Sequence, residues 1–178
     1  MGLRSVTAEL QVKGPSGVCV RTAVADLDGD GQKEIIIADA DIEDSKVVVL
    51  KNADGKGNQW AKIELPQSFT YGSLHALAIA DLNGDGRPDI VVNEQEELLP
   101  AGRENPRWVV WENLGNNRFK ERIILDAKLG GHELQAGDVD GDGDIDICSK
   151  AWGPRGWNGN GGRMHVDFLE NLLKPAAK

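Results

Sequence analysis

The sequence has no run of 18 apolar residues, which excludes a membrane-spanning helix within these 178 residues. It also has no cluster of basic residues, and its net charge is −9, so nucleic acid and anionic membrane surfaces are poor partners. No segment shows the periodicity of an amphipathic helix. There is no G-x-S-x-G motif and no cysteine paired with a nearby histidine, so no nucleophile–base signature stands out.

Cysteine is scarce, with Cys19 and Cys148 more than a hundred residues apart in apolar, strand-like segments. We expect two buried thiols, with a disulfide as the alternative. The N-terminal "MGLRSVTAEL" lacks the apolar region of a signal peptide. A length of 178 residues is enough for one domain with a real core.

Glycine is abundant, at 22 residues, and much of it lies in a repeated acidic motif. "ADLDGDGQKEIII" begins at Ala25, "ADLNGDGRPDIVV" at Ala80 and "GDVDGDGDIDICS" at Gly137. The first aspartates of these motifs, Asp26, Asp81 and Asp138, are 55 and 57 residues apart. This steady period indicates a repeat protein.

Each repeat predicts four short strands, because the similarity continues beyond the acidic loop. "VVVLKN" (47–52), "WVVWEN" (108–113) and "VDFLEN" (166–171) are equivalent, as are "QWAKIEL" (59–65) and "RFKERIIL" (118–125). A four-stranded unit of this length is typical of a propeller blade. We therefore predict an all-β propeller-type domain over residues 1–178, with blades at about 20–65, 75–125 and 132–171. A β-sandwich is the alternative, but it does not explain one motif recurring at one period.

The third repeat lacks its last strand, and "SVTAELQV" (5–12) lies upstream of Asp26 at the spacing expected for that strand. We expect residues 5–12 to complete the third blade. Three blades are too few for a ring, so we predict a homo-oligomer, with a dimer of six blades favoured. A larger ring, or a fragment of a longer propeller, is the alternative.

The acidic loops follow the pattern D-x-[DN]-x-D-G-x-x-[DE], which offers oxygen ligands suited to Ca²⁺. Nitrogen and sulfur ligands are absent, which argues against Zn²⁺. An EF-hand is excluded because the twelfth position holds Ile37, Val92 or Ser149 rather than glutamate, and a strand follows. The predicted ligands are Asp26, Asp28, Asp30, the Gln32 carbonyl and Glu34; Asp81, Asn83, Asp85, the Arg87 carbonyl and Asp89; and Asp138, Asp140, Asp142, the Asp144 carbonyl and Asp146.

About three Ca²⁺ per chain are expected, because three or four carboxylates in one loop repel one another without a cation. Since Asp144 would contribute its backbone, we expect its side chain to face solvent. A set of polar turns without metal is the competing interpretation. Modest affinity, on the order of 10⁻⁴–10⁻³ M as in extracellular modules, implies an extracellular or periplasmic location.

The loops and the strands that follow them resemble FG-GAP/VCBS repeats, the units of integrin α-subunit-like propellers. The resemblance extends from about Ser5 to Asn171, and "ENLGNNRF" (112–119) looks like the VCBS form, although the "FG" and "GAP" dipeptides are absent. It implies blades with calcium in the loops between first and second strands. It implies no single activity, because a propeller is a scaffold.

A ligand site is expected on the face opposite the acidic loops, where the variable loops lie. The loop "AWGPRGWNGNGG" carries Trp152, Trp157 and Asn158, with Arg163 close behind, and could bind carbohydrate. His75 and His132 each lie six residues before a first loop aspartate. Packing of the tryptophans and capping of strand ends by the histidines are the alternatives. The favoured function is a non-catalytic module for carbohydrate or protein; the alternative is a polysaccharide lyase or part of a carbohydrate-active enzyme.

Overall fold

The computed structural model describes residues 19–152, 161 and 163–173 of the chain. The predicted strand 5–12 and the candidate ligand residues Trp157 and Asn158 lie outside the described residues. All regular elements in the described part are β-strands. No helix there is long and apolar enough to cross a membrane.

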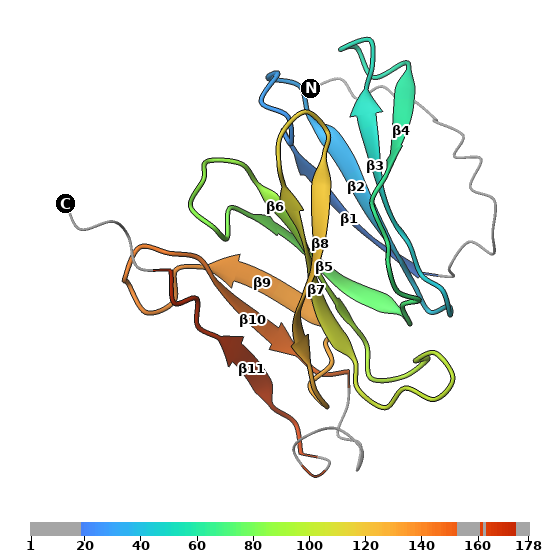
Figure 1. The fold of residues 1–178 in the computed structure, drawn as a ribbon, viewed down its shortest axis with the longest axis vertical. Helices are drawn as coiled ribbons and strands as arrows, with labels where there is room; N and C mark the ends of the chain where they lie inside the picture. Colours follow the sequence, from blue (N-terminus) through green and yellow to red (C-terminus); the bar gives the residue numbers. More distant parts are fainter. Residues whose placement is uncertain (1–18, 153–160, 162, 174–178) are drawn as a thin grey trace, which may run out of the picture.

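The strands form three antiparallel sheets in chain order (Figure 1). The first sheet has the order β1 (Cys19–Ala25), β2 (Glu34–Ala40), β3 (Val47–Asn52) and β4 (Trp60–Glu64). The second has the order β5 (Leu74–Ala80), β6 (Asp89–Glu94), β7 (Arg107–Asn113) and β8 (Phe119–Asp126). The third has β9 (Glu133–Gly137), β10 (Asp146–Lys150) and β11 (Val166–Leu169). The predicted strands are therefore confirmed within the described residues.

The second sheet lies between the other two, and its inner strand β5 contacts both β1 and β9 (Figure 1). Burial follows this arrangement. Every residue of β6 is buried, as expected for a strand covered on both faces. In β2, by contrast, burial alternates, with Ile36 and Ala38 buried and Ile35 and Ile37 half-buried. One face of the first sheet is thus open among the described residues.

Aromatic side chains fill the junction between the first and second sheets. Tyr71 and Trp111 meet edge to face, with ring centroids 6.0 Å apart and planes at 74°. The Trp111 indole N–H donates to the Pro66 oxygen at 2.6 Å, so its polar atom is paired although the ring is fully buried. Around these rings lie Leu27, Ile36, Val49, Leu74, Ile90 and Val92.

The junction between the second and third sheets combines apolar packing with a very close backbone approach. Trp108 packs with Leu134 and Ile147. A Cβ on Gly131 would lie 1.9 Å from Asn93 Nδ2, so only glycine fits where the chain enters the third sheet. Asn93 Nδ2 in turn lies 2.6 Å from the hydroxyl oxygen of Ser149, and this hydrogen bond joins the two sheets.

Two details differ from the sequence-based expectations. Cys148 is a free thiol and only partly buried, because its strand β10 has no sheet packed on that face among the described residues. The side chain of Cys19 lies outside the description. The strand predicted over 166–171 ends at Leu169, since the Asn171 N–H donates to Asp146 Oδ1 at 2.9 Å rather than to a neighbouring strand.

Candidate functional site

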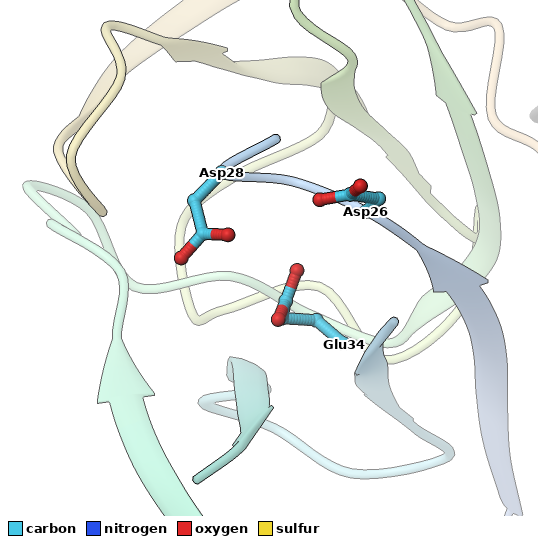
Figure 2. Close-up of side chains that lie close together, drawn as sticks. All are labelled: Asp26, Asp28 and Glu34. Atoms are coloured by element: carbon cyan, nitrogen blue, oxygen red, sulfur yellow. The ribbon is translucent and has the colours of Figure 1, made fainter. Parts of the chain in front are cut away.

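The loop from β1 to β2 brings three carboxylates together. Asp26, Asp28 and Glu34 each offer an oxygen, and these oxygens lie within 4.8 Å of one another (Figure 2). Asp26 and Asp28 come from the loop, while Glu34 is the first residue of β2 and is buried. Carboxylates at loop positions 1, 3 and 9 thus converge as the sequence pattern predicts.

The same hydrogen-bond frame holds all three acidic loops. At position 6, Gly31, Gly86 and Gly143 donate to the position-1 carboxylates at 2.9, 2.8 and 3.1 Å. The position-2 N–H groups donate to the position-9 carboxylates at 2.8–3.1 Å in each loop. These tight turns need glycine, because positions 4 and 6 have φ between 72° and 95° in every loop. Backbone donors therefore aim the carboxylates inward.

Glu34 is buried, and its carboxylate is only partly hydrogen-bonded. Its Oε2 accepts the Leu27 N–H at 2.8 Å, while its Oε1 is buried without a hydrogen-bond partner. Burial raises the pKa of this carboxyl, and the nearby charge of Asp28 adds to the effect. A buried acceptor that faces two further carboxylates fits a hard cation such as Ca²⁺.

A lysine that the sequence analysis missed faces the first loop. Lys51 Nζ forms an ion pair with Asp28 and lies 3.0 Å from Asp30 Oδ2. These contacts raise the pKa of the Lys51 ammonium and, with a hydrogen bond from the Gln32 N–H, lower the pKa of Asp30. The equivalent residues of the other repeats are Glu112 and Glu170, so the feature is particular to the first loop.

The second loop has the same frame with Asn83 at position 3, whose Oδ1 accepts the Asp85 N–H at 3.0 Å. Arg87 pairs with Asp85 through its guanidinium and also donates from Nε to the Asn113 oxygen at 2.8 Å. Desolvation raises the pKa of the buried Asp89 at position 9. This loop therefore presents fewer carboxylates and one paired aspartate.

The third loop gathers Asp138, Asp140 and Asp146, with oxygens within 4.8 Å of one another. The expectation that the Asp144 side chain faces solvent is wrong. Asp144 is only 7% exposed, and both of its carboxylate oxygens are buried without a hydrogen-bond partner. Burial, together with the nearby negative charges of Asp142, Asp146 and Asp140, raises the pKa of Asp144 to about 6. Asp144 lies two residues before Asp146, the buried first residue of β10.

At the other ends of the inner strands, two histidines and a tryptophan stack. The rings of His75 and His132 lie 3.8 Å apart with planes at 23°, and the ring of Trp152 lies 4.3 Å from His132. Arg21 Nη2 is 2.7 Å from His75 Nδ1, and Asp41 Oδ1 is 3.5 Å from His75 Nε2. Because β5 starts at Leu74 and ends at Ala80, this cluster lies at the opposite end of the strand from the second acidic loop.

Both imidazoles are held in the neutral form. Burial lowers the pKa of His75, and the charge of Arg21 adds to the effect. Burial and the adjacent His75 lower the pKa of His132 to about 4. Neutral rings stack without the repulsion that two imidazolium ions would suffer.

Buried acceptors border the same region. Glu96 accepts the Trp152 N–H at 3.3 Å through Oε2, whereas its Oε1 and Gln95 Oε1 have no hydrogen-bond partner within the described residues. Arg163 is exposed. Sequence reasoning missed Arg21 and Glu96, because no repeated motif singles them out.

Comparison with known families agrees with this geometry. A model of the FG-GAP-like repeat matches residues 16–92 and 94–149. No curated protein matches the chain. The matched segments contain all three acidic loops and the strands on either side of them. The chain belongs to the FG-GAP-like repeat family.

Proposed function

We propose that this chain is a calcium-stabilised β-propeller module that binds carbohydrate or a protein partner and does not catalyse a reaction. The observation that carries the proposal is the repeated convergence of inward-aimed carboxylates in loops with one common hydrogen-bond frame. Residues at positions 1, 3, 5 and 9 and the position-7 carbonyls of Gln32, Arg87 and Asp144 would hold about three Ca²⁺ per chain. Such sites suit an extracellular or periplasmic protein.

The calcium component is tested by calorimetry and thermal unfolding of the chain with Ca²⁺ and with chelator. Because Ca²⁺ would bind only the folded loops, it should raise the unfolding temperature in a concentration-dependent way. Mg²⁺ at the same concentration is the control, since it prefers tighter octahedral geometry than a flexible all-oxygen loop supplies. An unfolding temperature that Ca²⁺ and chelator leave unchanged would contradict structural calcium.

The ligand component rests on the stacked face around Trp152. Its side chain is 47% exposed, and an exposed indole face stacks on the apolar face of a sugar ring. Next to it, Glu96 accepts the Trp152 N–H at 3.3 Å, and buried oxygens of Gln95 and Glu96 have no hydrogen-bond partner within the described residues. The exposed indole favours carbohydrate over protein, and it is supported from behind because His132 packs against Trp152 and His75 packs against His132.

A glycan array followed by calorimetry on any ligand found tests this assignment. Trp152→Ala should abolish binding, whereas Phe69→Ala, which removes a similarly exposed aromatic ring elsewhere, should not. Binding that survives Trp152→Ala would move the site away from this face. Capture of a protein in place of a glycan would select the other ligand class.

Polysaccharide cleavage by β-elimination is the second candidate, because His132 is neutral near pH 7 and a neutral imidazole can abstract a proton α to a carboxylate. The stacking of both ring faces, on His75 and near Trp152, leaves only the ring edge for that role. Uronate-containing polysaccharides incubated with the chain test it directly. Release of unsaturated products that absorb in the near ultraviolet would replace the non-catalytic assignment.

A further inference from the structure

One asparagine per repeat ties neighbouring sheets together. Asn52, Asn113 and Asn171 end the equivalent segments VVVLKN, WVVWEN and VDFLEN. Asn113 Nδ2 donates to the Leu27 oxygen at 2.7 Å, and Asn171 Nδ2 donates to the Leu82 oxygen at 2.8 Å. Leu27 and Leu82 occupy position 2 of the acidic loops in the preceding sheets. Each of these two asparagines therefore links its own sheet to the one before it.

The same residues are anchored to their own acidic loops. The backbone N–H of Asn113 donates to Asp89 Oδ1 at 2.8 Å, and that of Asn171 donates to Asp146 Oδ1 at 2.9 Å. Both acceptors are position-9 carboxylates. The asparagine thus connects two consecutive acidic loops, and its role repeats at each of the two sheet junctions in the chain.

Among the described residues no sheet packs on the β1 side of the first sheet, and its asparagine lacks the equivalent bond. Asn52 accepts the Gly57 N–H at 3.0 Å through Oδ1, but within the described residues its Nδ2 donates to no acceptor. Val139 is the residue of the third loop equivalent to Leu27 and Leu82. It is 58% exposed, and its backbone oxygen accepts no hydrogen bond within the described residues. Among the described residues, the Asn52 amide of the first sheet thus lacks an acceptor, and the Val139 oxygen of the third loop lacks a donor.

We propose that a second copy of this chain joins these ends, with Asn52 of one copy donating to the Val139 oxygen of the other. The first sheet of each copy then packs on the third sheet of its partner, and two identical junctions close a ring of six sheets. Six lies within the usual range of about four to eight propeller blades. This inference rests on the propeller arrangement proposed above and assigns its partner.

The two open faces are apolar at the positions that the internal junctions bury. Val24 on β1 is 65% exposed, whereas its counterpart Ile79 packs into the first junction. Val166 and Phe168 on β11 are 67% and 46% exposed, whereas their counterparts Trp108 and Val110 are buried in the second junction. The first and third sheets lie on opposite sides of the second (Figure 1), so these faces cannot meet within one copy.

A cavity of about 500 Å³ is a second region where the other copy would bind. It lies between β8 and the end of β11, and Ile124, Leu169 and Leu172 contribute apolar surface to it. In the first two sheets a fourth strand pairs with the third, but the outer edge of β11 is unpaired among the described residues. An open edge beside an apolar cavity is suited to accept a strand.

The segment 5–12 of the second copy is the occupant that fits. In SVTAELQV, Val6, Ala8, Leu10 and Val12 alternate with polar residues, as in a strand with one buried face. Within the chain, nine residues (65–73) link the outer strand β4 to the inner strand β5 of the next sheet. Residues 13–18 give a link of similar length from segment 5–12 to β1, which directs the segment to the sheet before β1.

Sedimentation equilibrium of the full 178-residue chain over a wide concentration range tests the proposal. The chain should have twice its monomer mass. Asn52→Asp keeps the acceptor for Gly57 N–H but removes the amide donor, so the dimer Kd should rise about tenfold or more. Val24→Asp and Leu10→Asp should yield monomers, whereas Leu114→Asp, at an exposed turn away from both open faces, should remain dimeric.

Asn113→Asp is the matched comparison, because it makes the same change where the link lies inside the chain. It should lower the unfolding temperature of the chain and leave the dimer mass unchanged. A wild-type monomer at every concentration, a mass other than two copies, or a dimer unaffected by Asn52→Asp and Val24→Asp would overturn the proposal. Stabilisation by Ca²⁺ in a monomeric chain would show that ring closure alone has failed and that the calcium proposal stands.

Discussion

Lys51 Nζ lies 3.0 Å from Asp30 Oδ2 and also pairs with Asp28, so an ammonium group shares the first acidic loop with any bound cation. Calcium binding there requires Lys51 to give up these contacts. The Lys51→Met variant should therefore bind Ca²⁺ more tightly at this loop. A release cost of about 1 kcal/mol, typical of a partly exposed ion pair, corresponds to roughly fivefold in Kd.

Calorimetry on chains in which only the first loop retains its carboxylates resolves this site from the others. Lys62→Met is the matched control, because Lys62 pairs with the exposed Glu64 and not with a loop carboxylate. Equal Ca²⁺ affinity of Lys51→Met and the unaltered chain would mean that Lys51 gives up its ion pairs without a cost in binding free energy.

In the third loop, removing the charge of Asp144 and removing the charge of Asp146 should have different effects on Ca²⁺ affinity. Asp144 is predicted to use its backbone oxygen, and its buried side chain has no partner, so Asp144→Asn should leave Ca²⁺ affinity nearly unchanged. The same change should stabilise the calcium-free chain, because it relieves repulsion from Asp142 and Asp146. Asp146→Asn should weaken binding at this loop at least about tenfold, since position 9 supplies a carboxylate ligand.

Calorimetry and thermal unfolding with chelator measure both effects. A large loss of affinity in Asp144→Asn would show that its inward side chain is itself a ligand. Equal behaviour of the two variants would contradict the assignment of ligands by loop position.

The repeat period made the strands and the carboxylate convergence predictable, because both depend on local patterns. Asp26, Asp28 and Glu34 lie within nine residues, and a tight glycine turn leaves their side chains few directions to point. The pairing of strands followed from the same reasoning, since each sheet uses consecutive strands. Only the ends of strands shifted, as at Leu169.

The features that sequence reasoning missed depend on contacts between distant residues. Lys51 reaches the loop across 23 residues, and Arg21 reaches His75 across 54. Asp144 was placed in solvent because its loop position suggested only a backbone role, but the packing beside β10 decides its exposure. The asparagines Asn52, Asn113 and Asn171 did carry a sequence signal, since each ends one of the three equivalent segments; their acceptors, up to 89 residues away, did not.

Arg103 is expected to be the most important single charge for stability, because its partner Glu94 is fully buried. Glu94 also accepts N–H bonds from Gly72 at 2.6 Å and Arg107 at 2.7 Å, but only Arg103 neutralises its charge directly. Arg103→Met should cost about 3 kcal/mol, as for other broken buried pairs. That corresponds to a fall of roughly 6–12 °C in the unfolding temperature of a chain of this size.

Arg122→Met is the control for this change, because Arg122 pairs with Glu112 on the surface and should contribute less than about 1 kcal/mol. The double variant Arg103→Met, Glu94→Gln should recover part of the loss, since no unpaired charge is then buried. Equal, small effects of Arg103→Met and Arg122→Met would contradict the importance of this buried ion pair for stability.

His132 should make the chain less stable as the pH falls from about 6.5 to about 4. Its pKa is about 4 in the folded chain, because of burial and the neighbouring His75, Arg21 and Lys150, with only Glu133 opposing them. An unfolded histidine has a pKa of about 6.5, so in this interval the unfolded chain binds more protons than the folded chain. The stabilisation is complete above pH 6.5 and is lost toward pH 4.

Carboxylates also titrate between pH 4 and pH 6.5, so the unfolding free energy of the unaltered chain is compared with that of His132→Gln at each pH. The difference should change across this interval and be constant above it, and the His132 ring resonances should titrate near pH 4. A difference in unfolding free energy that does not vary with pH, or a His132 ring that titrates near pH 6.5, would contradict the buried, neutral state of His132.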